Sequence, residues 1–248
     1  MKVLILVQST DNSLYQPLIK AQMETWDAIE HPNIKVVYYR PNLQHEVLEG
    51  NILKVSHNKR GDHAFFVLMK SLRYLRNENW DYIIKTDNSV YVDKEEVYKL
   101  LLTKPREQYF GGFPITYNNL TEESKKRFTK NIKFLWGEFF VLSRDMAMHL
   151  VNTFNKAPLR GVGSDDIVVS AILAGFCPRD ESLKVTLDEN DLTGYAYRVR
   201  KAQLEYSPLF FQNEELKDII QSDIQIMNHI HTIKNGKTNN EQLIYEQA

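Results

Sequence analysis

A run of short polar side chains, Asp87-Asn88-Ser89, follows the apolar residues 82–84 after Lys85-Thr86, and a second strand-like run begins at Val90. Hard cations such as Mn²⁺ and Mg²⁺ prefer carboxylate and phosphate oxygens, so Asp87 could supply one strong ligand, and Asn88 and Ser89 two weak ones. The same residue types are also typical of a tight turn between strands. Position alone leaves both interpretations open.

A pair of adjacent carboxylates, Asp165-Asp166, follows the sequence Gly-Val-Gly-Ser and precedes an apolar stretch that predicts a helix over 167–174. Ser164 or Asp165 could cap that helix, and acidic residues in the first turn suit its dipole. A carboxylate held at this position could also act as a general base, and repulsion between the two neighbours can raise the pKa of one of them. The two interpretations are compatible.

Two histidines near the C-terminus, His229 and His231, follow residues 224–227, which we predict to form a short strand. Residues two apart on a strand face the same side, so the two imidazoles could bind one metal ion. Lys234 and Lys237 flank a glycine and could bind a diphosphate through charge and exposed N–H groups. The alternatives are ordinary buried or exposed histidines and a solvated tail.

The composition indicates one globular domain. Its overall charge does not favour binding to nucleic acid. With 43% hydrophobic residues over 248 positions, the chain can form one substantial core. A formal net charge of −1 gives no global basic field, although residues 125–127 and 198–201 form basic clusters that could contact phosphates or simply be solvated. Cys177 is the only cysteine, which suits the reducing cytosol. No run approaches the ~20 apolar residues of a membrane span, so we expect a soluble, cytoplasmic protein.

Alternating strand and helix patterns position these residues. Strands are predicted at 3–7, 34–39 and 81–84, and helices at 18–29, 64–76 and 94–102, which together indicate an α/β sheet with mainly parallel strands. Ligands of such sheets bind beyond the carboxyl ends of the strands, where Gln8, Ser9, Thr10 and residues 86–89 would lie. Further strands are predicted at 109–113 and 134–143 and further helices at 145–154 and 214–220. The chain is expected to be a single domain with a polar C-terminal extension.

Taken in order, several motifs resemble the β-1,3-galactosyltransferase and Fringe group of GT-A glycosyltransferases. They are Leu4-Ile5-Leu6-Val7-Gln8-Ser9, Glu24-Thr25-Trp26, residues 67–72 with Lys70, Ile83-Ile84-Lys85-Thr86-Asp87-Asn88-Ser89-Val90-Tyr91-Val92, residues 137–145 with Gly137 and Glu138, and Asp165-Asp166-Ile167-Val168-Val169. The resemblance covers residues 3–175. It departs from the family's acidic triplet at Asn88 and Ser89.

The resemblance implies a GT-A, Rossmann-like fold and an inverting transfer of a sugar from a nucleotide diphosphate-sugar, such as a UDP-sugar, to an acceptor hydroxyl. Residues 1–103 would bind the donor, and residues 104–248 would bind the acceptor and carry catalysis. The implied nucleotide-sugar ligands are Gln8, Ser9, Thr10, Lys70, Lys85, Thr86, Asp87, Asn88, Ser89, Gly137, Glu138, Lys234 and Lys237. Mn²⁺ or Mg²⁺ would be held by Asp87 and Ser89 with His229 or His231, and Asp166, or else Asp165, would be the base.

Three hypotheses follow for the acceptor and the activity. The first is a bacterial or viral enzyme that glycosylates a glycan or lipid. In the second, a viral enzyme acts on a modified DNA base, with residues 125–133 and 198–201 contacting phosphates and binding weakening as salt rises. In the third, Asn88 and Ser89 leave a sugar- or nucleotide-binding module without catalysis.

Overall fold

The computed structural model describes residues 1–42, 45–56, 63–115, 134–154, 165–186, 191–199 and 213–236. An eight-stranded sheet in the order β3-β4-β2-β1-β5-β8-β7-β9 forms its centre. Its strands are β1 (Val3–Gln8), β2 (Ile34–Asn42), β3 (Val47–Glu49), β4 (Ile52–Ser56), β5 (Tyr82–Asp87), β7 (Phe110–Ile115), β8 (Phe134–Ser143) and β9 (Arg179–Asp180). β4, β2, β1 and β5 run parallel, whereas β8 is antiparallel to both β5 and β7. The predicted mixed α/β sheet, parallel at its N-terminal side, is confirmed.

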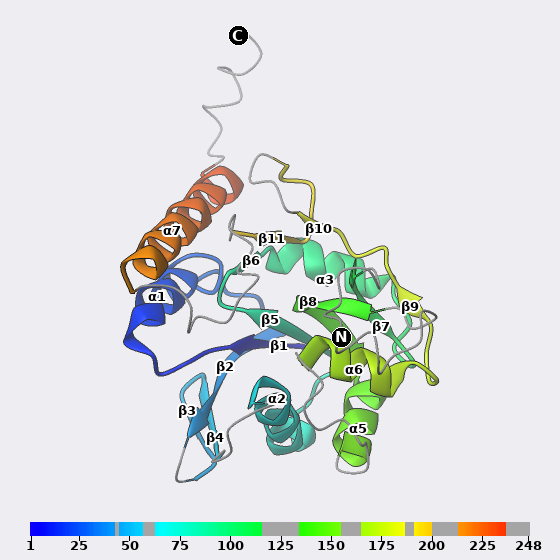
Figure 1. Ribbon diagram of the computed structural model, residues 1–248. Helices are drawn as coiled ribbons and strands as arrows, with labels where there is room; N and C mark the ends of the chain where they lie inside the picture. Colours follow the sequence, from blue (N-terminus) through cyan, green and yellow to red (C-terminus); the bar gives the residue numbers. More distant parts are fainter. Residues whose placement is uncertain are drawn as a thin grey trace, which may run out of the picture.

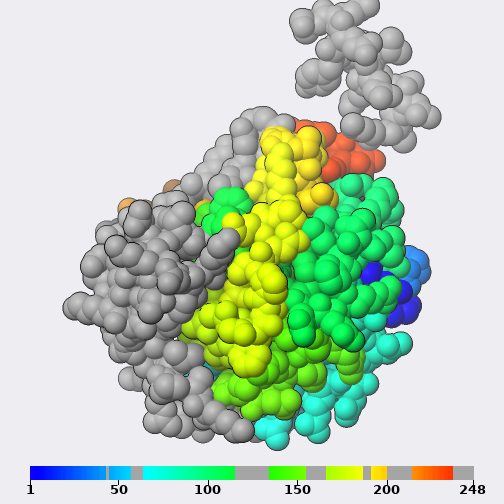
Figure 2. All heavy atoms as spheres, turned by 90° about the vertical axis from the view of Figure 1, so that its right-hand side faces the viewer, coloured from blue at the N-terminus to red at the C-terminus, as the bar shows by residue number. Residues whose placement is uncertain are grey.

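A second sheet continues from the end of β5. Its order is β10-β11-β6, formed by β10 (Val185–Thr186), β11 (Ala196–Arg198) and β6 (Val90–Val92). The segment that contains β9 to β11 crosses the surface beside α3 (Lys94–Leu102) toward the C-terminal helix (Figure 2). Since β6 begins three residues after Asp87, this small sheet fixes the position of the polar run between β5 and β6.

Helices cover both faces of the large sheet (Figure 1). On one face lie α2 (His63–Tyr74), α5 (Arg144–Thr153) and α6 (Asp165–Leu173). The 3₁₀ helix η2 (Leu75–Asn77) directly follows α2. On the other lie α3, α1 (Gln16–Glu24), preceded by η1 (Ser13–Tyr15), and α7 (Asn213–Asn235). Across the described ranges, no helix is both long enough and apolar enough to cross a membrane.

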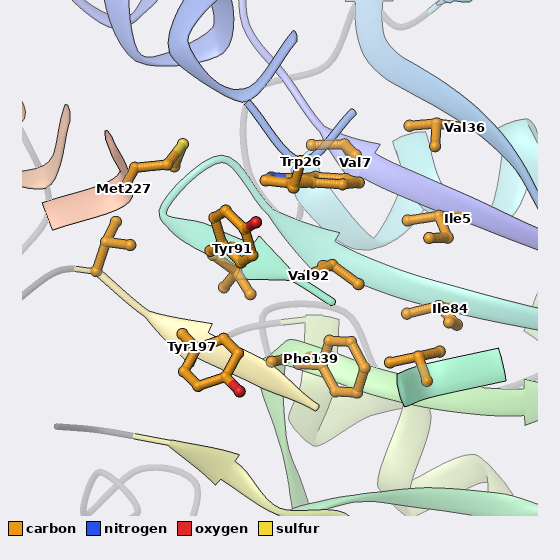
Figure 3. Packing of buried hydrophobic residues seen from close by; sticks show 14 of the residues in the cluster. Ile5, Val7, Trp26, Val36, Ile84, Tyr91, Val92, Phe139, Tyr197 and Met227 are labelled. Atoms are coloured by element: carbon orange, nitrogen blue, oxygen red, sulfur yellow. The ribbon is translucent and has the colours of Figure 1, made fainter. Parts of the chain in front are cut away.

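Strand alternation sorts the side chains between the two cores. Ile5, Val7 and Ile84 belong to one buried cluster with Trp26 on the α1–α7 face (Figure 3), whereas Leu6 and Ile83 pack with α2, α5 and α6. Because side chains alternate along a strand, Gln8, Lys85 and Asp87 belong to the α2–α6 side. These three polar residues therefore lie on the face that α2, α5 and α6 cover.

The C-terminal region differs from its prediction. Residues 214–220 and 224–227 were expected to form a helix and then a strand, but α7 is one continuous helix, Asn213–Asn235. Leu216, Ile220, Met227 and Ile230 are buried at helical spacing against α1 and β6. The helical period, which extends over the whole of α7, therefore overrides the short strand-like alternation at residues 224–227.

Helix α1 also ends earlier than expected, at Glu24 rather than at Ile29. Thr25 Oγ1 donates to the Ala21 carbonyl at 2.7 Å, and the Trp26 side chain turns into the core with no exposed surface. By contrast, α3 (Lys94–Leu102) and β8 (Phe134–Ser143) have the predicted bounds.

Candidate functional site

The site begins where the parallel strands end. Gln8 is the register partner of both Asp87 and Tyr39, and the Ser9 N–H donates to the Tyr39 carbonyl at 2.9 Å. Beside these ends, facing the start of α2, lies a cavity of about 280 Å³. Its lining consists of Gln8, Ser9, Thr10, Tyr39, Pro41, Ala64 and Val67. Polar residues at the strand ends and apolar residues of α2 thus form one pocket, as ligand sites in α/β sheets do.

The Asp87-Asn88-Ser89 run is a turn between β5 and β6 that is held from two sides. Gln22, fully buried on α1, donates through Nε2 to the carbonyls of Asp87 at 3.2 Å and Val90 at 3.0 Å. The Val199 N–H donates to the Ser89 carbonyl at 3.1 Å, and the Ser89 side chain is only 2% exposed. The turn interpretation is confirmed, and the Asp87 carboxylate remains partly exposed beside the pocket end of β5.

Lys85 occupies the interior of this site. Its side chain is 1% exposed, and Nζ donates to Asp87 Oδ1 at 2.6 Å and to the Gly137 carbonyl at 2.5 Å. Lys85 and Asp87 lie two residues apart on β5 and therefore share a face. Lys85 was predicted to bind the nucleotide-sugar, but its buried ammonium contacts protein oxygens.

Gly137 connects β8 to the start of α6. Its N–H donates to Asp166 Oδ2 at 3.0 Å, and the Ile167 N–H donates to Asp166 Oδ1 at 2.8 Å. A Cβ at position 137 would lie 3.0 Å from Asp166 Cβ and 3.1 Å from its Cγ, so the close approach of α6 to β8 needs glycine here. Asp166, 8% exposed, is thereby fixed at a helix N-terminus that favours its negative charge.

Thr86 and Glu138 extend the site toward the second sheet. Thr86 Oγ1 donates to the Glu138 carbonyl at 3.0 Å, and the Thr86 side chain has no exposed surface. The Glu138 carboxylate forms an ion pair with Arg198, with 3.0 Å between Oε2 and Nε. Arg198 also lies over the Trp136 ring, 4.8 Å from its centroid. The described member of the basic cluster 198–201 is therefore paired within the protein.

The histidine pair was predicted on a wrong premise, because both residues lie on α7. Residues two apart on a helix point in different directions. His229 is exposed, while His231 Nδ1 lies 3.3 Å from the Tyr91 hydroxyl and 3.1 Å from Asn235 Nδ2. Burial lowers the pKa of His231 below its ordinary value. His231 thus helps to pack α7 on β6 and forms no pair with His229.

The predicted lysines also contact the protein itself. Lys234 Nζ lies 2.9 Å from both Asp93 Oδ2 and the Leu192 carbonyl, and Lys70 Nζ donates to the Ser56 carbonyl and hydroxyl. Lys237 and the side chain of Asp165 lie outside the described residues.

A divalent cation does not fit the described part of this site. No three His, Cys, Asp or Glu side chains gather into a possible metal site among the residues that the structure describes. Asp87 Oδ1 is already bound by an ammonium group, and the Ser89 side chain is buried. The cation predicted from the sequence therefore has no ligand set there.

Sequence reasoning missed Gln22 and most of the pocket wall. Gln22 was detectable as one amide among the apolar residues of α1, Leu18, Ile19 and Ala21, all of which are buried. Tyr39, Pro41 and Ala64 carry no chemical signal of their own, and only the placement of α2 against β2 makes them pocket residues.

Comparisons with known proteins place the fold but no family, since no family model and no curated protein matches the chain. A glycosyltransferase involved in glycosylation of the major capsid of PBCV-1 aligns with a TM-score of 0.50 and 8% identity, over 89% of this chain and 99% of that chain. The galactosyltransferase LgtC, with donor and acceptor sugar analogues, aligns with a TM-score of 0.49 and 12% identity, over 88% of this chain and 95% of that chain. GlyE of Streptococcus pneumoniae aligns with a TM-score of 0.47 and 10% identity, over 94% of this chain and 64% of that chain. The similarity to the PBCV-1 enzyme concerns the fold, and it confirms the predicted GT-A architecture.

Proposed function

We propose that this chain is a glycosyltransferase that moves a sugar from a nucleotide diphosphate-sugar, a UDP-sugar, to an acceptor hydroxyl of a glycan. The observation that carries the proposal is the pocket at the ends of β1 and β2, next to the contact chain Asp87–Lys85–Gly137–Asp166. The fold shared with a known glycosyltransferase supports the same activity. Residues 1–103 contribute the donor pocket, and residues 104–248 contribute Asp166.

The roles follow from position. Gln8, Ser9 and Thr10 face the nucleotide in the pocket. Asp166 takes the proton of the acceptor hydroxyl as that oxygen attacks the anomeric carbon. The bond from this carbon to the diphosphate breaks, and its electron pair leaves with the phosphate oxygen. Direct attack inverts the anomeric configuration through an oxocarbenium-like transition state.

A binding experiment tests the donor pocket. Ala64 lines the cavity, so Ala64→Phe should fill it, while Ala28→Phe adds the same ring at an exposed position. Calorimetry with UDP, GDP, ADP and CDP should show one preferred nucleotide, bound at least about tenfold more weakly by Ala64→Phe and equally by Ala28→Phe. If no nucleoside diphosphate binds the wild type, the proposal fails.

A product experiment tests the chemistry. The wild type, incubated with its preferred donor and a panel of glycan acceptors, should form a product whose anomeric proton coupling shows the configuration opposite to that of the donor. A product with the same anomeric configuration as the donor would exclude a single-step displacement in which Asp166 is the base. Binding without turnover on any acceptor would instead favour the non-catalytic module.

A modified DNA base is not the preferred acceptor. Arg198 is paired with Glu138, and the other basic residues of the two clusters lie outside the described ranges. No contact in the described part of the chain favours DNA over a glycan.

A further inference from the structure

The Asp87 carboxylate, at the end of β5 beside the proposed donor pocket, has an ammonium group as its charged partner. Lys85 Nζ lies 2.6 Å from Asp87 Oδ1, a distance typical of a short charge-assisted hydrogen bond. The Lys85 side chain is 1% exposed and the Asp87 side chain 30% exposed. The ammonium is therefore inside the protein, and the carboxylate that it contacts is partly exposed.

The protein fixes this ammonium in place. Besides Asp87, Nζ donates to the Gly137 carbonyl at 2.5 Å, and the Thr86–Phe139 and Lys85–Phe140 register pairs hold β5 against β8. Lysine is a compact point charge on a flexible stem, so two strong acceptors on adjacent strands are what give it a defined position. The Gly137 N–H in turn holds Asp166 Oδ2 at 3.0 Å.

A divalent cation at Asp87 would compete with this arrangement. Such a cation binds carboxylate oxygen at about 2.0–2.2 Å, which would bring it close to the buried ammonium and cause strong repulsion. Two of the predicted metal ligands do not compensate, because the Ser89 side chain is buried and His231 contacts Tyr91 and Asn235.

We propose that Lys85 is the built-in cation of this site: its ammonium takes the place at Asp87 that a divalent metal would take, and its bond to Gly137 fixes Asp166. The inference rests on the proposed function. Asp87 with Lys85 is electrically neutral as a pair, so Asp87 does not repel the diphosphate. Lys85 is a positioning residue, since its ammonium is buried and contacts Asp87 and the Gly137 carbonyl.

The test measures nucleotide affinity by calorimetry with the full chain, once with EDTA and once with excess Mn²⁺. The probe is UDP, or whichever nucleoside diphosphate of the binding panel the wild type prefers. Wild-type dissociation constants should agree within about threefold between the two conditions. In Lys85→Met, the uncompensated Asp87 should weaken binding by at least about tenfold in EDTA, and Mn²⁺ should restore part of that loss.

Lys94→Met is the matched control. Lys94 is also buried, 6% exposed, and its Nζ contacts Asp27 Oδ1 at 3.1 Å and the Ile29 carbonyl at 2.9 Å, on the face opposite to α2. The Lys94→Met variant should bind the nucleotide as tightly as the wild type does, both in EDTA and in Mn²⁺. If Lys85→Met fails to fold, the wild-type comparison still decides.

Two results would overturn the inference while leaving the proposed function intact: a wild type that loses more than about tenfold affinity in EDTA, or a Lys85→Met variant that behaves like Lys94→Met. A wild type that binds no nucleoside diphosphate in either condition would overturn both.

Discussion

The backbone of Gly137 links Lys85 to Asp166: its carbonyl accepts from Lys85 Nζ at 2.5 Å, and its N–H donates to Asp166 Oδ2 at 3.0 Å. Through this single residue, the carboxylates of Asp87 on β5 and Asp166 on α6 are held in one array. The distance between the Asp87 and Asp166 carboxylates therefore depends on how closely α6 approaches β8.

Gly137→Ala should disturb that approach. The added Cβ would meet Asp166 Cβ at 3.0 Å and Cγ at 3.1 Å, which forces the carboxylate to move. We expect kcat to fall by up to about tenfold, because a shift of a few tenths of an ångström is smaller than the ~1 Å misplacement that costs about 10²-fold. Steady-state kinetics on the preferred donor and acceptor would measure it, with nucleotide affinity within about twofold of the wild type.

Gly112→Ala on β7 is the control for strain alone. Its Cβ would lie 3.1 Å from the Phe139 carbonyl oxygen and 3.2 Å from Phe140 Cβ, so it overpacks the same sheet without touching Asp166. Both variants should lose about 1–3 kcal/mol of stability. An equal fall in kcat in the two would show that the Gly137 effect is only structural.

Asp166→Asn should remove the base while retaining its shape. Loss of a general base lowers kcat by about 10²–10⁴-fold, and the affinity for the nucleotide should stay within about twofold of the wild type. Asp145→Asn is matched, because Asp145 also lies in the first turn of a helix and accepts from a backbone N–H, that of Gln108, at 2.8 Å. Unchanged kcat in Asp166→Asn would exclude Asp166 as the base.

The sequence predicted the parallel strands and the polar residues at their ends because apolar periods and the position of strand ends are local properties. Gln8 and Asp87 were expected at the same edge, and they are register partners. The contact of Lys85 with the Gly137 carbonyl was not predictable, since Gly137 lies 52 residues further along the chain. Only the antiparallel pairing of β8 with β5 brings them together.

The failures have equally physical causes. Strands β9, β10 and β11 span two or three residues each, too few to display a period. Residues 224–227 show a strand-like alternation in isolation, but burial of α7 against α1 decides for a helix. That difference changed His231 from an expected metal ligand into a packing residue.

Gln22→Met should destabilise the protein by about 1–3 kcal/mol, because the buried carbonyls of Asp87 and Val90 lose a shared donor. Urea unfolding would measure the change. Gln16→Met on the same helix is the control: Gln16 donates to the Thr10 carbonyl at 2.7 Å in an exposed position, and its loss should cost less than about 1 kcal/mol. An equal loss of stability in the two variants would contradict a role of Gln22 in stabilising the turn between β5 and β6.

The pH dependence of stability should include a contribution from His231. Burial lowers its pKa in the folded state, whereas the unfolded chain has the ordinary value of about 6.5. The unfolded state therefore binds more protons as the pH falls below about 6.5, and stability decreases toward the lowered folded-state pKa. The loss between about pH 7.5 and pH 5.5, measured by urea unfolding, should be smaller in His231→Gln than in the wild type. His229→Gln, exposed on the same helix, should keep the wild-type difference.

Lys234→Met distinguishes a structural role from the diphosphate-binding role that the sequence predicted. Lys234 Nζ contacts Asp93 Oδ2 and the Leu192 carbonyl, each at 2.9 Å, and lies over the Tyr197 ring, 5.1 Å from its centroid. Removal of this partly buried ammonium should cost about 2 kcal/mol of stability and leave nucleotide affinity unchanged. Lys217→Met, which removes an exposed pair with Glu214 on the same helix, should cost less than about 0.5 kcal/mol. If Lys234→Met instead weakens nucleotide binding at wild-type stability, then Lys234 is a donor ligand and its contacts to Asp93 and Leu192 are secondary.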